Sequence, residues 1–430
     1  MAQREVLADR IQMERLKACS VKYERDARRQ RLLAKILLAG FSVLLSLVIG
    51  ELLVRHYYPI GDMTLELHQR YLHRYKPNSR RIYRFSAANG GNCILASING
   101  QGRRGELVSM NRPHVLVYGD SFISATFTPI KQTFVWQLEQ KLTASLSTAP
   151  QVINCGVSGY GPDQESLVLE DEIDSLRPQL VIVSIYAGND FGDLLRNKIY
   201  KLDDQKKLTN NHYTLDSSLV SQFAALQHSS PFYSVRLLRE AWQHLAQSRT
   251  AAPTPSDADY LESWLRDSQS EYEEYIINGN NSVRNLFGDH YDADVSLTPN
   301  SESSRYKRIL MDRVIERMKK ITAARSVPLM LMIIPAALDV VDNYVPSVNT
   351  RQYPEYRRSE LTDTVEEIAR KYHLPYVNLF GVFREHGASA LYYVVDNDHW
   401  NAEGQQLAAG VVAEYIKRQH LLGASLGTRQ

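Results

Sequence analysis

Five short apolar segments alternate with longer amphipathic segments between residues 112 and 420. The apolar segments are "HVLVYG" (114–119), "QVINCG" (151–156), "LVIVSIY" (180–186), "LMLMIIP" (329–335) and "YVNLF" (376–380). The segments with apolar residues at helical intervals of three and four are 131–145, 163–176, 306–325 and 359–373. Strands that are apolar throughout and separated by helices are typical of a parallel sheet covered on both faces. The pattern therefore predicts one α/β domain over residues 112–420.

A long, mostly polar stretch interrupts this alternation between residues 191 and 304. Within it, two segments have helical periodicity, 231–247 and 260–276, and a linker separates them at 249–259. In open α/β sheets ligands bind beyond the carboxyl ends of the strands, and this insertion leaves such an end. We expect the insertion to border a ligand site, although a partner-docking module or a loosely ordered excursion also fits the pattern.

The strongest asymmetry of the chain lies at its N-terminus. Residues 1–35 hold ten Lys or Arg and five Asp or Glu, and the nineteen residues that follow, 36–54, contain one ionisable group, Glu51. A helix rises about 1.5 Å per residue, so this segment is just long enough to cross a bilayer core of about 30 Å. Because no small-residue cleavage pattern follows it, we interpret the segment as an uncleaved signal anchor rather than a signal peptide or a buried core helix.

The basic residues before the span predict the topology of the chain. They favour a cytoplasmic segment over residues 1–35 and a single pass through a bacterial inner membrane at 36–54, with the rest of the chain periplasmic. Residues 55–111 are polar and basic, and we interpret them as a juxtamembrane stalk with short strands, packed on the main domain or free of it. Cys93 and Cys155 then share the oxidising side, where they either form a disulfide or stay as separate thiols.

Overall charge excludes one class of partner. The 430 residues carry a formal net charge of +2, and no basic stripe with interleaved aromatic residues is present. Proteins that track nucleic acid usually show such a stripe, so we expect no nucleic-acid partner. The expected partners are the membrane, through residues 36–54, and a substrate of the external domain.

Four short polar strings carry the candidate chemistry. They are "GDS" (119–121), "NCGVSGYG" (154–161), "AGND" (187–190) and "DNDHWNAEG" (396–404). Each alone is typical of a turn, because Gly, Asp, Asn and Ser are common turn residues. Together, however, three of them follow consecutive strands and so share one edge of the sheet, and the fourth brings a histidine. Acyl transfer needs a nucleophile, a base, a group that orients the base, and donors to the oxyanion, and the four strings can supply all four.

In this order, the strings resemble the SGNH, or GDSL-type, hydrolase family over most of residues 112–420. The resemblance implies a flavodoxin-like, three-layer αβα fold with a central parallel sheet, to which this chain adds the transmembrane helix and the largely helical insertion at about 191–304. It implies that Ser121 is the nucleophile, that His399 is the general base, and that Asp396 orients the base through the D-x-x-H pattern.

The same resemblance implies three donors to the oxyanion. They are the backbone N–H groups of Ser121 and Gly159 and the side-chain amide of Asn189. Gly156 lies in the same string as Gly159, so this glycine is the least defined of the assignments. One departure from the family pattern is that "YGDSF" lacks the leucine that often completes the first block, which is a packing position.

Physical reasoning from the residues agrees with these roles. A serine hydroxyl is a poor nucleophile until a neighbouring imidazole can take its proton. A tight turn across the two-residue gap would let Asp396 reach Nδ1 of His399, leaving Nε2 for Ser121. Asp398 is an alternative orienting group, although immediate neighbours tend to point apart. Because no second His or Cys cluster appears at ligand spacing, we expect no metal ion and no cofactor.

Three functions fit this sequence. The first is a serine esterase that acts, through an acyl-serine intermediate, on an O-acyl ester, above all O-acetyl, of a carbohydrate or lipid-like substrate outside the cytoplasm. The second is an O-acetyltransferase that modifies an exopolysaccharide or a cell-wall glycan. The third is a non-catalytic binding component of an envelope polysaccharide machinery, which would have no need of a paired serine and histidine.

Overall fold

The structure is a computed structural model of the 430-residue chain. It describes residues 2–57, 64–85, 89, 91, 93–145, 149–227, 232–247, 256–284, 286–393 and 398–422. The chain divides into two compact units. One unit holds residues 1–60 and 230–251, and the other holds residues 61–229 and 252–430.

The larger unit is built around a five-stranded parallel sheet. Its strands in chain order are β5 (His114–Tyr118), β6 (Gln151–Asn154), β7 (Leu180–Tyr186), β12 (Leu329–Ile334) and β13 (Tyr376–Asn378). Their order across the sheet is β13-β12-β7-β5-β6, and Val115 of β5 pairs with Val152 on one side and Leu180 on the other. The predicted α/β fold with a central parallel sheet is confirmed, and all five predicted strands are present.

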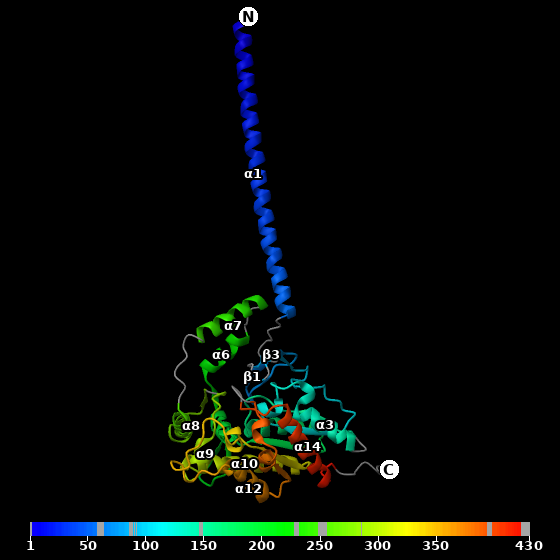
Figure 1. The fold of residues 1–430 in the computed structure, drawn as a ribbon, viewed down its shortest axis with the longest axis vertical. Helices are drawn as coiled ribbons and strands as arrows, with labels where there is room; N and C mark the ends of the chain where they lie inside the picture. Colours follow the sequence, from blue (N-terminus) through cyan, green and yellow to red (C-terminus); the bar gives the residue numbers. More distant parts are fainter. Residues whose placement is uncertain are drawn as a thin grey trace. The chain divides into compact units, whose positions relative to one another are not determined.

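Helices cover the sheet in two groups. The first consists of α3 (Phe134–Ser145) and α14 (Ala402–Arg418), which pack side by side (Figure 1). The second consists of α4 (Pro162–Leu176), α10 (Glu302–Ala323) and α12 (Glu360–Lys371). From β5 the chain first steps to β6 at one edge of the sheet, and it then returns across the sheet to β7, β12 and β13. Because crossover connections are right-handed, this change of direction places α3 on one face and the second group of helices on the other.

Residues 64–97 belong to the same unit as the sheet. They form the hairpin β1 (Leu65–His68) and β2 (Leu72–Tyr75), followed by β3 (Arg80–Arg84) and β4 (Cys93–Ser97). His73 of β2 is buried, and its Nε2 lies 2.9 Å from the carbonyl oxygen of Ser158. Of the predicted stalk, 55–111, residues 64–97 thus pack on the main domain, whereas residues 55–57 form the end of α1 in the other unit.

The two cysteines of the larger unit are free thiols. Cys93 is exposed on β4, whereas Cys155 is buried and its Sγ accepts a hydrogen bond from Arg103 at 2.9 Å. Of the two alternatives for this pair, the structure therefore shows separate thiols and no disulfide.

The insertion is largely helical. It contains α6 (Ser217–Gln227), α7 (Tyr233–Gln247) and α8 (Asp257–Tyr272), which continues as a short π-helix (Glu273–Ile277). The periodicity of 231–247 and 260–276 predicted α7 and α8, and missed α6 and the hairpin of β8 (Tyr200–Leu202) and β9 (Leu208–Asn210). Short strands of three residues carry too little alternation to be recognised in a sequence.

Within the larger unit, a buried ionic network joins the C-terminal part of the insertion to helix α10. Lys307 of α10 is completely buried, and its Nζ lies 3.1 Å from Asp292 Oδ1 and 2.8 Å from Asp294 Oδ1. Burial lowers the pKa of Lys307, but the two carboxylates more than offset this effect, so the net pKa lies above its ordinary value. The network fixes the segment that leads from the insertion into α10.

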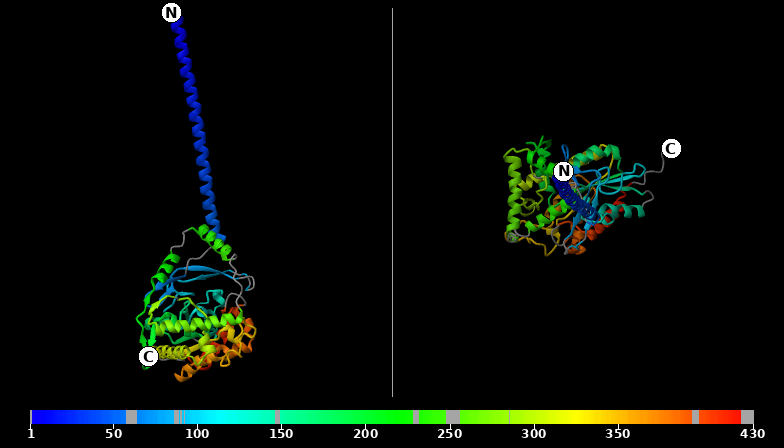
Figure 2. Two further views of the ribbon diagram at one scale, coloured as in Figure 1. Left: turned by 90° about the vertical axis from the view of Figure 1, so that its left-hand side faces the viewer. Right: turned by 90° about the horizontal axis from the view of Figure 1, so that it is seen from above.

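The smaller unit contains α1 (Ala2–Tyr57), drawn as one unbroken helix in both views of Figure 2. Among the described residues, α1 holds the one segment that is long and apolar enough to cross a membrane. The predicted span, 36–54, lies within it. Its apolar side chains are largely exposed, as Val43, Leu44 and Leu47 illustrate.

We expect Lys307→Met to destabilise the fold strongly. The substitution removes the ammonium from two buried carboxylates, and breaking a buried pair in this way typically costs about 3–5 kcal/mol. Lys320→Met on the same helix is the matched control, because Lys320 is exposed and pairs with Glu316 at the surface. Urea unfolding of the full chain in mild detergent, followed by circular dichroism, measures both variants. Equal midpoints for the two variants would contradict the anchoring role of Lys307.

Candidate active site

Ser121 lies directly beyond the carboxyl end of β5, at the start of the four-residue helix α2 (Ser121–Ser124). The turn needs Gly119, because a Cβ there would lie 2.4 Å from Cγ1 of Ile123. Asp120 caps the helix, and its Oδ1 accepts a hydrogen bond from the backbone N–H of Phe122 at 2.8 Å. The strand and the cap together hold Ser121 at the edge of the sheet, where it is only partly buried.

His399 faces Ser121 from the segment that leads into α14. The Nε2 of His399 lies 2.6 Å from the Oγ of Ser121. The imidazole stacks on the ring of Phe122, with centroids 4.6 Å apart. The next residue, Trp400, is buried in the core and donates from Nε1 to the carbonyl of Phe122 at 3.2 Å. Packing on both sides of the hydrogen bond therefore fixes its geometry.

The carboxylate that contacts the other side of the imidazole is Asp398. Its Oδ1 lies 3.0 Å from Nδ1 of His399, and its Oδ2 accepts from the hydroxyl of Tyr186 at 3.2 Å. Asp396, to which the D-x-x-H pattern assigns the orienting role, lies outside the described residues. The contact between Asp398 and His399 departs from the expectation that immediate neighbours point apart.

These contacts set the protonation of the pair. Burial lowers the pKa of His399, but the hydrogen bond to Asp398 and the charges of Asp398, Asp120 and Asp289 more than offset it, so its net pKa lies above the ordinary 6.5. Burial raises the pKa of Asp398, but the contact with His399 outweighs this effect and the net pKa lies below its usual value. Asp398 is thus ionised at neutral pH and favours a strongly basic imidazole.

Asn189 follows β7 and forms the N-cap position of α5 (Asp190–Asn197). It is nearly buried and lines the same cavity as Ser121 and His399. The turn before it is tight, since a Cβ on Gly188 would lie 2.6 Å from the ring of Tyr186. The carboxylate of Asp190 locks this turn by accepting from the backbone N–H of Tyr186 at 2.8 Å.

The two glycines of the "NCGVSGYG" string differ in their environment. The N–H of Gly156 donates to the side chain of Asn154 at 3.0 Å, so it is already engaged. Gly159 has a left-handed φ of +74°, and a Cβ there would lie 2.9 Å from the ring of Phe287 in the insertion. Ser121, Asn189 and His399 line one cavity, whereas Gly159 is not among the described residues that line it.

A group of buried carboxyl groups lies behind this edge of the sheet. Burial raises the pKa of Asp120 to about 7, although His399 and the bond from Phe122 lower it. Burial, together with the charge of Asp120, raises the pKa of Glu165 and Asp190 well above their ordinary values. Glu165 and Asp190 are therefore largely neutral at pH 7 and Asp120 is only partly ionised, which limits the negative charge behind Ser121.

The cavity above Ser121 has a volume of about 290 Å³. The insertion supplies Trp264, Asp289, His290 and Tyr291 to its wall, and Tyr344 comes from the segment between α11 (Ala337–Val340) and α12. Sequence reasoning did not single out any of these five residues. The only signal for the four residues of the insertion was its position after β7, because aromatic and acidic residues in a long polar segment carry no motif. Tyr344, outside the insertion, had no signal.

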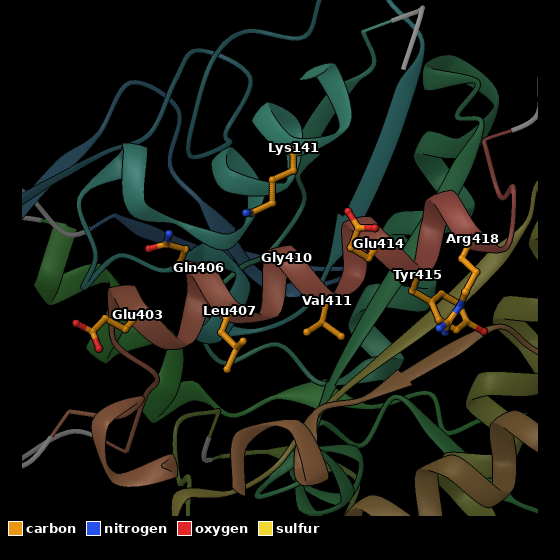
Figure 3. A pocket seen from close by; sticks show the side chains of 9 residues that line it. All are labelled: Lys141, Glu403, Gln406, Leu407, Gly410, Val411, Glu414, Tyr415 and Arg418. Carbon is orange, nitrogen blue, oxygen red and sulfur yellow. The ribbon is translucent and has the colours of Figure 1, made fainter. Parts of the chain in front are cut away.

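A second hollow lies along α14, away from this cavity. It measures about 640 Å³, and Figure 3 shows that its wall consists of side chains along α14 together with Lys141 of α3. Its described lining contains no serine, cysteine or histidine, so it offers no nucleophile with a base. Among the described residues, no three or more His, Cys, Asp or Glu side chains are grouped so that they could hold a metal ion.

Comparison with known families agrees with the α/β fold. The model of the GDSL-like lipase/acylhydrolase family matches residues 117–407. No curated protein is similar enough to this sequence to count as a relative.

Solved structures of hydrolases show distant similarity. A lipase/acylhydrolase from Enterococcus faecalis is 12% identical, with a TM-score of 0.35, over 71% of this chain and 96% of that one. A catalytic mutant of the acetylxylan esterase Axe2 from Geobacillus stearothermophilus is 13% identical, with a TM-score of 0.34, over 74% of this chain and 97% of that one. Nothing about the substrate of this chain follows from similarities at this level.

We expect Asp398→Asn to lower kcat/KM by roughly 10³- to 10⁴-fold at neutral pH, because the imidazole loses the carboxylate that fixes its tautomer. In the unchanged protein the acid limb of the pH profile should lie above pH 6.5, since His399 acts only in its neutral form and its pKa is raised. Asp398→Asn removes the negative charge that raises the pKa of His399, so the acid limb of this variant should lie at lower pH.

Asp396→Asn is the matched control for this experiment. The pH dependence of ester hydrolysis, measured on both variants, decides which aspartate orients the base. A large loss of activity in Asp396→Asn, with little change in Asp398→Asn, would assign that role to Asp396.

Proposed function

This chain belongs to the GDSL-like lipase/acylhydrolase family, whose members hydrolyse ester bonds, and we propose that it is a serine esterase that removes small acyl groups, above all acetyl, from a neutral carbohydrate. The observation that carries the proposal is the 2.6 Å contact between Ser121 Oγ and His399 Nε2 within a cavity that also contains Asn189. The predicted membrane span favours action outside the cytoplasm.

The first half of the proposed reaction transfers the acyl group to Ser121. As its Oγ attacks the ester carbonyl carbon, Nε2 of His399 takes the hydroxyl proton and the C=O π electrons move to the carbonyl oxygen. The tetrahedral intermediate then collapses, the ester C–O bond breaks, and His399 returns the proton to the leaving sugar oxygen. The ionised Asp398 stabilises the imidazolium that exists between these steps.

The second half releases the acyl group. Water attacks the acyl-serine carbonyl while His399 takes one of its protons, and the carboxylic acid leaves as Ser121 regains its proton. In both halves the oxyanion would meet the N–H group of Ser121 and the amide of Asn189, the two predicted donors that line the cavity. Each such donor typically stabilises the transition state by about 2.7–4 kcal/mol.

The cavity wall supports a carbohydrate ester rather than a long-chain lipid. Trp264 and Tyr291 lie with ring centroids 6.0 Å apart, and aromatic faces of this kind pack well on amphipathic ligands. Asp289 and Asp398 also line the cavity, and burying carboxylates against an acyl chain would be costly. The described lining residues include no Lys or Arg, and the carboxylates of Asp289 and Asp398 would repel an anionic glycan.

We expect Ser121→Ala to lower the release of acetate from acetylated xylan by an amount on the order of 10⁶-fold, since the variant lacks the nucleophile. The full chain in detergent is incubated with the acetylated glycan and with an unacetylated oligosaccharide, and acetate and acetyl-sugar are measured. Unchanged acetate release would contradict the role of Ser121. If acetyl groups appear on the oligosaccharide and this transfer depends on Ser121, the result would favour the O-acetyltransferase. If both proteins bind the glycan equally and neither shows any turnover, the result would favour the non-catalytic component.

We expect Asp289→Asn to raise kcat/KM for an acetylated polyuronate by about three- to tenfold relative to a neutral acetylated glycan, because one like charge leaves the cavity wall. The gain should shrink as salt rises. Asp204→Asn, at an exposed carboxylate in the turn between β8 and β9, is the matched control and should not change this ratio. An unchanged ratio in Asp289→Asn would contradict the assignment of Asp289 to substrate selection.

A further inference from the structure

Helix α7 has a continuous apolar face that is exposed. Val235, Leu238 and Trp242 lie three and four residues apart and so share one side of the helix. Their exposed fractions are 48%, 71% and 74%, and Phe232, just before the helix, is 57% exposed. Soluble surfaces rarely expose large apolar side chains in such a row, so this face points to a partner.

The N-terminus of α7 is bonded to Glu51, the one ionisable residue of the predicted span. Oε1 of Glu51 accepts from the backbone N–H of Tyr233 at 2.8 Å, and Oε2 accepts from the N–H of Ser234 at 3.0 Å and from its hydroxyl at 2.8 Å. Arg55, one turn further along α1, pairs with the same carboxylate at 2.8 Å. A carboxylate near the end of an apolar span is thereby satisfied by the start of a second helix.

This contact fixes the depth at which α7 begins. Glu51 precedes the last residue of the span, Val54, by three positions, which is about 5 Å along a helix. In a bilayer, α7 would therefore start where the hydrocarbon core meets the headgroups. Figure 1 shows α7 leaving the end of α1 obliquely rather than continuing along its axis, so α7 does not extend the span of α1.

Basic residues accompany the apolar face. Arg239 is exposed one turn after Val235, and the guanidinium of Arg236 lies 5.0 Å from the ring centroid of Tyr233. Helices that lie in a membrane interface combine Trp and Leu on one face with Arg and Lys at its border, where the cations can reach lipid phosphates.

We propose that α7 is an interfacial helix that lies on the outer surface of the same membrane that α1 crosses, with Val235, Leu238 and Trp242 in the lipid. The proposal goes beyond the esterase function and rests on α1 as the span. The occupant of the apolar face is lipid rather than a second copy of the chain, because Glu51 ties α7 to the point where the apolar part of α1 ends.

Lipid quenching tests this placement in the full chain. In a background of Cys19→Ser and Cys93→Ser, single cysteines are introduced by Leu238→Cys, Phe41→Cys or Leu107→Cys and labelled with the environment-sensitive fluorophore NBD. The background protein without a new cysteine is labelled in the same way, and its fluorescence measures any labelling of the buried Cys155. The proteins are reconstituted into phosphatidylcholine–phosphatidylglycerol vesicles that contain nitroxide lipids, labelled near the headgroup or deep in the acyl chain, and iodide serves as the aqueous quencher.

We expect the label at position 238 to be quenched by the headgroup-proximal nitroxide at least about threefold more than the label at 107, and to be protected from iodide. The label at 41 should be quenched by the deep nitroxide. Equal behaviour at 238 and 107 would overturn the proposal for α7 alone. Protection from iodide at 238 that appears only at high protein-to-lipid ratio would assign its face to a second copy and also overturn it.

Failure of the membrane span gives a different result from failure of the esterase function. Absence of quenching at position 41 would overturn the span and, with it, the interfacial placement of α7. Ester hydrolysis by each labelled protein, which depends on Ser121 and not on α7, is measured in parallel. Full hydrolysis together with a water-exposed label at 238 would therefore overturn the inference and leave the proposed function standing.

Discussion

The hydrogen bond between Ser121 Oγ and His399 Nε2 joins residues 278 positions apart, and the arrangement of the sheet unit serves to hold it. Phe122 is central to this arrangement. Its ring stacks on His399 and on Tyr186, and its carbonyl accepts the hydrogen bond from Trp400. The same residue thus links the end of β5, the end of β7 and the segment that precedes α14. A change in the packing of this ring would alter the nucleophile, the base and the orienting carboxylate together.

Buried ion pairs hold the part of the insertion that lines the cavity. Arg196 of α5 lies 2.8 Å from Asp193 and 3.1 Å from Glu271, which in turn lies 3.1 Å from Nε2 of His290. Burial lowers the pKa of His290, but Glu271 more than offsets this effect, so its net pKa lies above the ordinary value. Buried ion pairs contribute little net stability compared with apolar packing, but they demand one geometry. Here they position Asp289 and Tyr291 beside a catalytic edge that the sheet itself provides.

Carboxylates that accept from several donors occur in both units. In the larger unit, buried carboxylates fix a wall of the cavity, whereas in the smaller unit Glu51 binds the start of α7. Both are carboxylates in an apolar context, and both are satisfied by several donors rather than one. Several donors to one carboxylate reduce the penalty for burial and specify one geometry.

The sequence alone determined the layers of this protein and singled out Ser121 and His399, whose side chains the structure brings into contact. Parallel strands that are buried on both faces must be apolar throughout, so β5, β6, β7, β12 and β13 were recognisable as runs. Three of the four turn motifs followed β5, β6 and β7. Tertiary structure alone decided which carboxylate meets Nδ1 of His399 in the described part of the chain, which residues of the insertion line the cavity, and what Glu51 binds. Those choices depend on contacts between segments far apart in the chain, and side-chain periodicity reports only the burial of each segment and not its neighbour.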